Sequence, residues 1–448
     1  MNNKIKVSIK ANISHLNSRE RELLAVLKKV VLLVNPLYQE QKNKGSYPAD
    51  LTVEEFESYV QANPNQKAAL ESPFTNIVRD GEALKAIPYS EVYKEHLEKI
   101  AAVLIHASEL SDNEPFKYFL KMRASSFLTN DYHPTDIQWV HLLNTPLELT
   151  IGPLEEYDDT LLGIKRSFEA ILGIAIPEEN QRLKMYQELA RDYDASLARE
   201  FGYNPSGGNT PMVIIDEVSA GGYSADRYIP TAFNLPNDIF IRQSVGSKQV
   251  FIRNVMSGRF SITKQIAERI AVRYIERMDP EKMLQFVIGH ELSHGLGVSM
   301  KNGLKDLAST LEEAKADVLG VMFMYYIEKI GKLPAGTAED IAISHCIDSI
   351  RQIYRDSEGA HGFGAVMQLN WLIAKNALAL NNGEMVFNLE LLSPALHELG
   401  QQLIRLGTGG DYNKAKEFVT KWGDKIPGIS EVIKKIADVP TDLEPVFE

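Results

Sequence analysis

The 448-residue sequence contains one cysteine, Cys346, so it can form neither an intrachain disulfide nor a zinc cluster built on several thiolates. It has no run of lysine and arginine that could follow a phosphate backbone. Its 48 basic residues are outnumbered by 60 acidic ones, which gives a net charge of -12. We therefore expect no nucleic-acid partner, and we expect His, Asp and Glu to supply the ligands of any bound metal.

Long hydrophobic runs are also absent. The longest, VLGVMFMYYI at residues 318–327, is too short to cross a bilayer. The N-terminal segment MNNKIKVSIKANISHLNSRE lacks the apolar core of a signal peptide. These features predict a cytoplasmic protein without membrane contact, and they leave its oligomeric state open.

Helical periodicity is present at both ends of the chain. Apolar residues recur at three- and four-residue spacing in RELLAVLKKVVLLV and EVYKEHLEKIAAVLIHASEL, and again from Asp279 almost to the end. The segments LELTIG, TPMVIIDEV and KQVFIRNV, separated by Gly, Pro and Asn, predict a small sheet between them. We predict a predominantly helical α+β protein with two lobes and a cleft between them. Its expected regions are a mainly helical N-terminal part (1–150), a β-containing part with substrate-binding segments (151–260) and a helical zinc-binding catalytic part (261–448).

The stretch DPEKMLQFVIGHELSHGLG predicts a helix that Asp279 caps and that ends at a glycine pair. His290 and His294 are four residues apart, so both imidazoles project from one face and can bind one zinc ion. Glu291 lies about 100° around the helix, where it can reach a water on the metal without binding the metal itself. The alternative is a core helix that happens to carry three polar residues.

A third ligand is needed, because two histidines leave a tetrahedral zinc site underfilled. The following segment, STLEEAKADVLGVMFMYYIEKIG, predicts a helix capped by Ser309 with Glu312 or by Thr310 with Glu313. Glu313 and Asp317 share an apolar face, which favours zinc binding by Glu313 and support of a ligand histidine by Asp317. For Glu312 we expect only a favourable interaction with the helix dipole.

The H-E-x-x-H motif followed by E-x-x-x-D resembles the thermolysin-like zinc peptidases, and LEEAKAD is similar to the E-E-x-R-A-E/D motif of the dipeptidyl peptidase III family. Three further stretches resemble that family in the same order along the chain: GPLEEYDDTLLGIKRSFEA, NLPND and EGAHGFGAVMQ. Lys315 and Ala365 stand where the family usually has arginine.

The resemblance implies one Zn²⁺ per chain, short peptide substrates and release of N-terminal dipeptides. It implies that Glu291 is the general base and that Tyr157 and His361 stabilise the transition state. It further implies that the substrate's amino terminus is held by four residues, namely Glu155, Glu169, Asn234 and Asn237.

Other interpretations remain open at this point. The protein could hydrolyse a different amide or act as an endopeptidase, or it could be a non-catalytic, zinc-containing, peptide-binding protein. Retention of Glu291 argues against the last of these, because a structural metal site has no use for a base. The glycines around His361 are explained equally well by helix packing, and His345 is expected to be structural.

Overall fold

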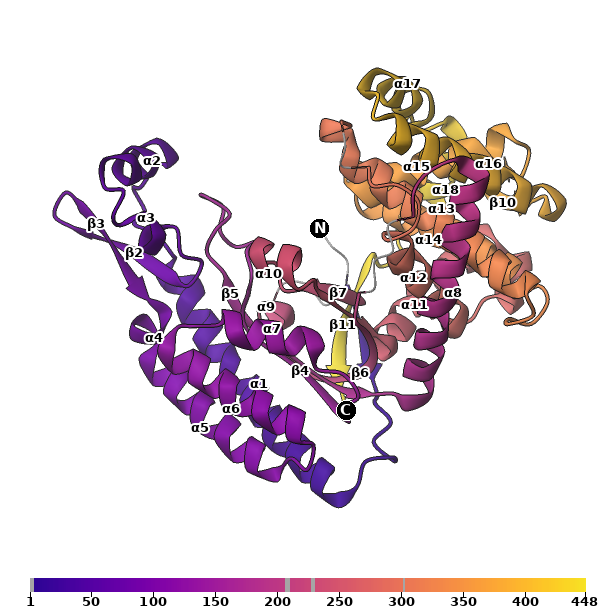
Figure 1. Cartoon of the computed structure of the whole chain (residues 1–448). Coiled ribbons are helices and arrows are strands. Elements are labelled where there is room, and N and C mark those ends of the chain that lie inside the picture. The colour runs from indigo at the N-terminus through magenta and orange to yellow at the C-terminus, as the bar shows by residue number, and fades with distance from the viewer. Residues whose placement is uncertain (1–3, 206–209, 227–229, 301–302) are drawn as a thin grey trace. The chain divides into compact units, whose positions relative to one another are not determined.

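The computed structural model describes residues 4–205, 210–226, 230–300 and 303–448 (Figure 1). The predicted class, α+β and predominantly helical, is confirmed. The chain forms two compact units that it enters more than once. Unit 1 comprises Met1–Ser8, Gln181–Asn209 and Met256–Val446, and unit 2 comprises Ile9–Asn180, Thr210–Val255 and Phe447–Glu448. Residue 150, the first expected boundary, therefore lies inside unit 2, whereas the second, at 260, lies close to a crossing between the units.

Unit 2 is built on a five-stranded sheet in the order β4-β5-β6-β8-β7, in which β6 and β8 are parallel and the other neighbours are antiparallel. Its strands are β4 (Leu147–Glu155), β5 (Ser167–Ala175), β6 (Met212–Gly222), β7 (Ala232–Leu235) and β8 (Lys248–Ile252), with a separate hairpin of β2 (Thr75–Asp80) and β3 (Ala83–Pro88). Its helices are α1 (Ser18–Lys44), α2 (Val53–Ala62), α3 (Lys67–Leu70), α4 (Tyr89–Val92), α5 (Lys94–Leu110), α6 (Glu114–Thr129), α7 (His133–His141), α9 (Tyr223–Asp226) and α10 (Ile239–Ser244).

The three predicted strand segments correspond to β4, β6 and β8, whereas β5, β7 and the β2–β3 hairpin were not predicted. Every residue of β5 is buried, so its sequence SFEAILGIA shows no alternation between polar and apolar positions. It also contains a charged residue, Glu169, which is buried.

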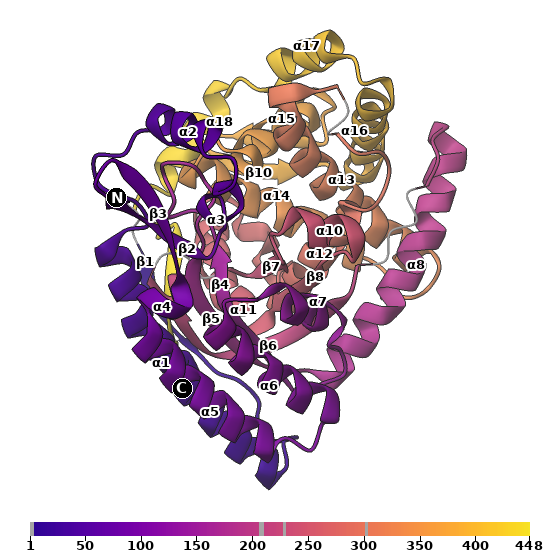
Figure 2. The same cartoon turned by 60° about the vertical axis from the view of Figure 1, so that its left-hand side comes forward.

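Helix α1 packs against β5 and β6 and against α5, which in turn packs on α6 (Figures 1 and 2). The contact with β6 is close at one glycine. A Cβ on Gly221 would lie 2.3 Å from the backbone oxygen of Val31 in α1, so a larger residue would push the helix away from the sheet.

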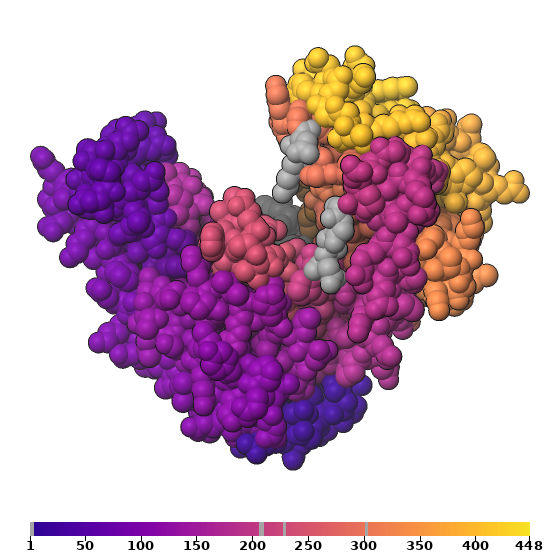
Figure 3. Space-filling view, in the orientation of Figure 1, coloured from indigo at the N-terminus to yellow at the C-terminus, as the bar shows by residue number. Residues whose placement is uncertain are grey.

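Unit 1 is mainly helical. Helix α8 (Pro177–Phe201), most of which belongs to this unit, forms part of its surface (Figure 3). The remaining helices are α11 (Arg253–Ile270), η1 (Val272–Arg277), α12 (Pro280–Ser293), η2 (Lys305–Leu307), α13 (Ala308–Lys329), α14 (Thr337–Arg355), α15 (Ala360–Ala374), α16 (Leu389–Gly409), α17 (Tyr412–Trp422) and α18 (Pro427–Lys435). Two small sheets pair β9 (Leu378–Asn381) with β10 (Glu384–Phe387) and β1 (Lys4–Ile9) with β11 (Asp442–Phe447). Within the described part of the chain, no helix has both the length and the apolar character that a bilayer span requires.

Two buried glutamates in the sheet of unit 2 differ in how they are compensated. Glu148 on β4 accepts hydrogen bonds from the Lys248 ammonium at 2.7 and 2.8 Å and from the Trp139 indole at 2.8 Å. Glu217 on β6 is 1% exposed, and no described group hydrogen-bonds to either of its carboxyl oxygens. Burial raises the pKa of Glu217 from 4.5 to about 8, so its carboxyl is neutral when the protein is folded at neutral pH.

The Glu217 carboxyl predicts a specific dependence of stability on pH. Its pKa is higher in the folded state than in the unfolded state, so its contribution is complete below about 4.5 and is lost as the pH rises through about 8. In Glu217→Gln this ionisation cannot occur. We expect the melting temperature of the variant, relative to the native protein, to be higher at pH 9 than at pH 5 by about 3 °C or more.

The measurement is thermal unfolding followed by circular dichroism at both pH values. Substitution of the exposed Glu82 by Gln serves as the control and should give the same difference at pH 5 and pH 9. A Glu217→Gln difference that does not depend on pH would contradict the assignment of a neutral buried carboxyl.

Candidate metal centre

Helix α12 carries both histidines of the H-E-x-x-H motif. As predicted, the Asp279 side chain caps the helix by accepting a hydrogen bond from the Lys282 backbone N–H, and Pro280 occupies the first turn. The helix ends at Ser293, but His294 keeps helical backbone angles at the C-cap (φ -60°, ψ -32°). The two imidazoles therefore remain neighbours, with ring centroids 4.8 Å apart.

A pair of glycines lets α13 approach α12 at the level of the first histidine. A Cβ on Gly320 would lie 2.7 Å from the backbone nitrogen of His290, and a Cβ on Gly289 would lie 3.0 Å from the Gly320 carbonyl oxygen. No side chain larger than hydrogen fits between these backbones. Glu313 lies about two turns before Gly320, so the close contact brings its carboxylate to the histidines of α12.

The predicted ligand set is brought together. The Glu313 Oε2 atom lies 3.4 Å from His290 Nε2 and 3.8 Å from His294 Nε2, and the candidate ligand atoms of the three residues all lie within 4.8 Å of one another. His361, at the start of α15, directs its Nδ1 to the same oxygen at 3.3 Å and is half exposed. The close approaches at the glycines around His361 are to the preceding turn: a Cβ on Gly362 would lie 1.9 Å from the Asp356 carbonyl oxygen, whereas a Cβ on Gly364 would make only ordinary contact with Ala314 of α13.

The residues present fit a bound divalent cation. Glu313 Oε2 is buried, and no described group makes a hydrogen bond of normal geometry to it, although three imidazole nitrogens face it. An uncompensated buried carboxylate oxygen is costly, and a cation held between it and the imidazoles removes that cost. Two imidazoles and one carboxylate are ligands typical of a zinc site that keeps a further position open.

Both histidines of the motif are oriented from behind by carboxylates of α13. His290 Nδ1 lies 2.8 Å from Asp317 Oδ1, as predicted for a residue that supports a ligand. His294 Nδ1 lies 3.1 Å from Glu312 Oε1. Because each Nδ1 is engaged in this way, the Nε2 atom of each ring is directed to Glu313.

The predicted roles of two features of α13 were wrong. The helix begins at Ala308, after Leu307, without a side-chain cap, so neither Ser309 nor Thr310 forms the predicted capping box. Glu312 does more than complement the helix dipole. Besides His294, it contacts the buried Lys315 ammonium at 2.9 Å, which also donates to the Leu296 carbonyl at 3.0 Å. Spacing alone could not tell which side of α13 faces the histidines.

The structure adds a hydrogen-bonded chain behind His290 that was not predicted. Gln368 Nε2 donates to Asp317 Oδ2 at 2.8 Å, and Gln368 Oε1 lies 3.0 Å from His345 Nε2. The His345 ring stacks on Phe286 at 4.2 Å, and all these side chains are buried. The buried, hydrogen-bonded position of His345 agrees with the structural role expected for it, which stays a prediction. Gln368 follows His361 by about two helical turns on α15, but no sequence spacing relates it to Asp317, which lies 51 positions away.

These charges shift one another's pKa values. Burial alone would lower the pKa of His290, but the bond to Asp317 and the proximity of Glu313 outweigh burial and raise it well above its usual value. Burial would raise the pKa of Glu313, but the neighbouring imidazoles outweigh this effect and lower it. The charge of the half-buried Glu291 also contributes to the raised pKa of His290, which indicates that the carboxylate lies near this centre.

Several of the residues predicted to bind substrate gather in unit 2. Glu155 ends β4, and burial together with the charge of Glu156 raises its pKa to about 7. Burial and the charge of Glu155 raise the pKa of Glu169 on β5 to about 8. The pKa of Tyr157 is raised by partial burial and by the same three carboxylates. Glu155, Tyr157 and Glu169 therefore form one acidic group at the end of the sheet.

The two predicted asparagines lie on either side of Pro236. The Asn237 side chain donates to the Leu154 carbonyl oxygen at 3.3 Å, immediately before Glu155 in the chain. Asn234 Oδ1 is buried, and no described group hydrogen-bonds to it. Asn237 therefore lies next to the acidic group. Asn234 lies on β7, and no described contact joins it to that group.

Three residues near the acidic group were missed. Ser224 Oγ donates a short hydrogen bond to Glu169 Oε2, and the Tyr223 ring stacks on Tyr157 with centroids 6.2 Å apart. The charge of Glu217 contributes to the raised pKa of Glu169. Tyr223 and Ser224 follow β6 directly, and no sequence spacing relates them to β4 or β5.

The comparisons with known proteins agree with one another. The model of peptidase family M49 matches residues 58–303. The chain is similar to the solved structure of DPP III from Caldithrix abyssi, with 28% identity, a TM-score of 0.91 and coverage of 99% of this chain and 98% of that chain. It is also similar to dipeptidyl-peptidase III from Corallococcus sp. strain EGB, with 25% identity, a TM-score of 0.78 and coverage of 99% and 95%.

A curated relative is Nudix hydrolase 3 of Arabidopsis thaliana, which is 27% identical over 434 residues. The match covers 93% of this chain and 55% of the relative, so the chain spans about half the length of that protein. The family match extends over more than half of the present chain and includes both histidines of the motif. The chain therefore belongs to peptidase family M49.

Proposed function

We propose that this protein is a zinc-dependent peptidase that releases dipeptides from the amino terminus of short peptides. The observation that carries the proposal is that His290 and His294 face a buried carboxylate oxygen of Glu313 that lacks a hydrogen-bond partner among the described residues. Family membership and the likeness to two dipeptidyl-peptidase III structures support the class of substrate.

The centre would be held by His290, His294 and Glu313. A zinc ion held there would supply Lewis acidity, which would lower the pKa of a bound water and polarise the scissile carbonyl. Asp317 and Glu312 accept hydrogen bonds from the Nδ1 atoms of the two histidines and so fix the tautomer that presents Nε2.

The protons are moved by Glu291, which accepts one from the attacking water and passes it to the leaving amine. Tyr157 and His361 donate hydrogen bonds to the carbonyl oxygen as negative charge develops on it. Removal of one such donor typically lowers the rate by about 10²- to 10³-fold.

The site of cleavage is set by the acidic group of unit 2. In this proposal Glu155 accepts hydrogen bonds from the substrate ammonium, and Asn234 and Asn237 bind the backbone of the first residues. Glu169 adds a second carboxyl. The raised pKa values of Glu155 and Glu169 support this role, because a bound ammonium would stabilise the ionised carboxylates that burial disfavours in the free protein.

We expect about one zinc per chain, lost in His290→Ala, His294→Ala and Glu313→Ala, because a site with three protein ligands cannot spare one. Elemental analysis of the purified proteins measures this. His361→Ala is the matched control and should keep its zinc, since His361 faces the same oxygen but is not a ligand in the proposal. Full zinc content in Glu313→Ala would reject that residue as the third ligand.

Glu291→Gln should keep the metal and the melting temperature but lose turnover, because the amide has nearly the same shape and cannot accept a proton. Peptide digestion read by mass spectrometry, together with zinc analysis, tests this. Near-native activity of the variant would exclude Glu291 as the base. Absence of cleavage by the native protein across a broad peptide library would favour the non-catalytic alternative.

Acetylation of the substrate's amino terminus should lower cleavage by about ten- to a hundredfold, because a charge-assisted hydrogen bond is worth about 1.5 to 3 kcal/mol. Free and acetylated forms of one short peptide are incubated with the protein, and the products are identified by mass. With the free peptide, the first product should be the N-terminal dipeptide.

Glu155→Gln provides the control for this comparison. It should slow cleavage of the free peptide and have little effect on the acetylated one, because the interaction it weakens is already absent there. Equal rates for the two peptides, with internal cuts, would favour the endopeptidase alternative.

A further inference from the structure

Tyr157 projects from the loop that joins β4 to β5. Its side chain is 73% exposed, and the ring contact described for it is the stack on Tyr223, with an interplanar angle of 24°. An exposed side chain on a loop is a poor hydrogen-bond donor in catalysis unless the loop itself is rigid, since donors must be held within about 0.5 Å of their working position.

The loop after Tyr157 is organised around one carboxylate. Asp159 Oδ1 accepts hydrogen bonds from the backbone N–H groups of Leu161 and Leu162 at 3.1 Å, and Oδ2 accepts those of Ile164 and Lys165 at 2.8 Å. Burial would raise the pKa of Asp159, but these bonds and a fifth, from a tyrosine hydroxyl, outweigh burial and lower it. The carboxylate therefore stays ionised and holds the turn.

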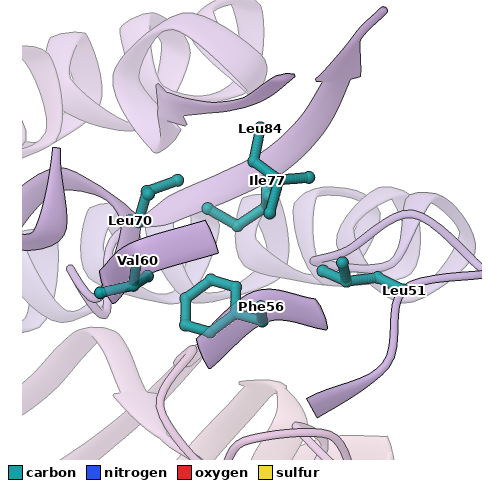
Figure 4. Close-up of a cluster of buried hydrophobic side chains, with 6 residues drawn as sticks. All are labelled: Leu51, Phe56, Val60, Leu70, Ile77 and Leu84. Carbon is teal, nitrogen blue, oxygen red and sulfur yellow. The ribbon is translucent and has the colours of Figure 1, made fainter. Parts of the chain in front are cut away.

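The tyrosine that gives the fifth bond belongs to a small subdomain formed by residues 46–88. Tyr47 donates its hydroxyl to Asp159 Oδ2 at 2.7 Å, and its ring packs edge-on against Phe56 with centroids 6.4 Å apart. Phe56 is part of a hydrophobic cluster drawn from α2, α3, β2 and β3 and the segment before them (Figure 4). Its members are Leu51, Phe56, Val60, Leu70, Ile77 and Leu84.

Further contacts join the loop to this subdomain. Leu161 and Leu162 pack against the hydrophobic cluster. The buried Lys165 ammonium donates to the Leu70 and Ser72 carbonyl oxygens at 2.8 and 2.7 Å and to the Thr75 hydroxyl at 2.8 Å.

Asp158, which precedes Asp159, is also held in place. Its Oδ2 accepts hydrogen bonds from the hydroxyls of Tyr38 in α1 and Ser167 in β5, at 2.7 and 3.1 Å. Both residues that follow Tyr157 are thus fixed by side chains from outside the loop.

We infer that Tyr47 is a positioning residue for the reaction, because its hydroxyl bonds to the Asp159 carboxylate that fixes the loop carrying Tyr157. The inference rests on the proposed function, in which Tyr157 donates to the carbonyl oxygen. It assigns a catalytic contribution to the small subdomain of residues 46–88, which contributes none of the candidate catalytic residues.

The test is Tyr47→Phe, which removes the hydroxyl and leaves the ring against Phe56. We expect kcat to fall about tenfold, because a donor that is misplaced by a fraction of an ångström stabilises the transition state less. KM should change by less than about twofold, since Tyr157 acts in the transition state and not in ground-state binding. Zinc content should be unchanged.

Tyr59→Phe is the matched control. Tyr59 packs against the same cluster, and its substitution leaves the bond between Tyr47 and Asp159 in place, so kcat should stay at the native value. The melting temperatures of both variants are recorded alongside the kinetics.

A double-mutant cycle separates positioning from general stability. In a Tyr157→Phe background, Tyr47→Phe should lower kcat by less than about twofold, because the donor it positions is already missing. An equal loss in both backgrounds, or native kcat in Tyr47→Phe alone, would overturn the inference while leaving the proposed function intact. Native kcat in Tyr157→Phe alone would remove the proposed role of Tyr157 itself, and with it the inference.

Discussion

The candidate metal centre depends on the burial of one carboxylate oxygen of Glu313, which the nitrogens of three histidines face. Without a cation, the oxygen has no hydrogen-bond partner of normal geometry among the described residues. Asp317 and Glu312 hydrogen-bond to the Nδ1 atoms of His290 and His294, so the Nε2 atoms of these histidines face the Glu313 oxygen. Such an arrangement is unfavourable in isolation and becomes favourable when a metal is bound, which is the behaviour expected of a preformed ligand set.

Much of this candidate centre could be predicted from the sequence because its candidate ligands obey helical spacing. His290 and His294 share a helix face by their separation, and Glu313 with Asp317 repeats that separation on the next helix. The role of Glu312 could not be predicted in the same way. Residues 312 and 313 point about 100° apart on α13, and only the packing of α13 on α12 determines that both reach a histidine. Gln368 escaped notice because its partner, Asp317, is 51 positions away in the sequence.

The helices were predicted where apolar periodicity was strong, and the strands where β-branched residues cluster. β-Branched composition revealed β4, β6 and β8, although these strands are almost wholly buried and carry charged residues as β5 does. The sequence of β5, SFEAILGIA, is richer in Ala, Gly and Leu and gives a weaker strand signal. The β2–β3 hairpin was missed for a different reason. It lies within a stretch that reads as helical on both sides, and its stability comes from a local cluster assembled from four short elements.

The two units illustrate different ways of placing a polar group. In unit 1, helices carry the candidate ligands, and a close contact between Gly289 and Gly320 sets the separation of α12 and α13. In unit 2, Glu155 ends a strand and Glu169 lies within the neighbouring one, but Tyr157 lies on a loop, where secondary structure gives no rigidity. The bonds to Asp158 and Asp159 supply the missing order. Some come from the backbone of the loop itself, and the others come from α1, from β5 and from the small subdomain. A residue on a loop can therefore serve in catalysis only as well as its anchors hold it, and for Tyr157 those anchors extend as far as Tyr47.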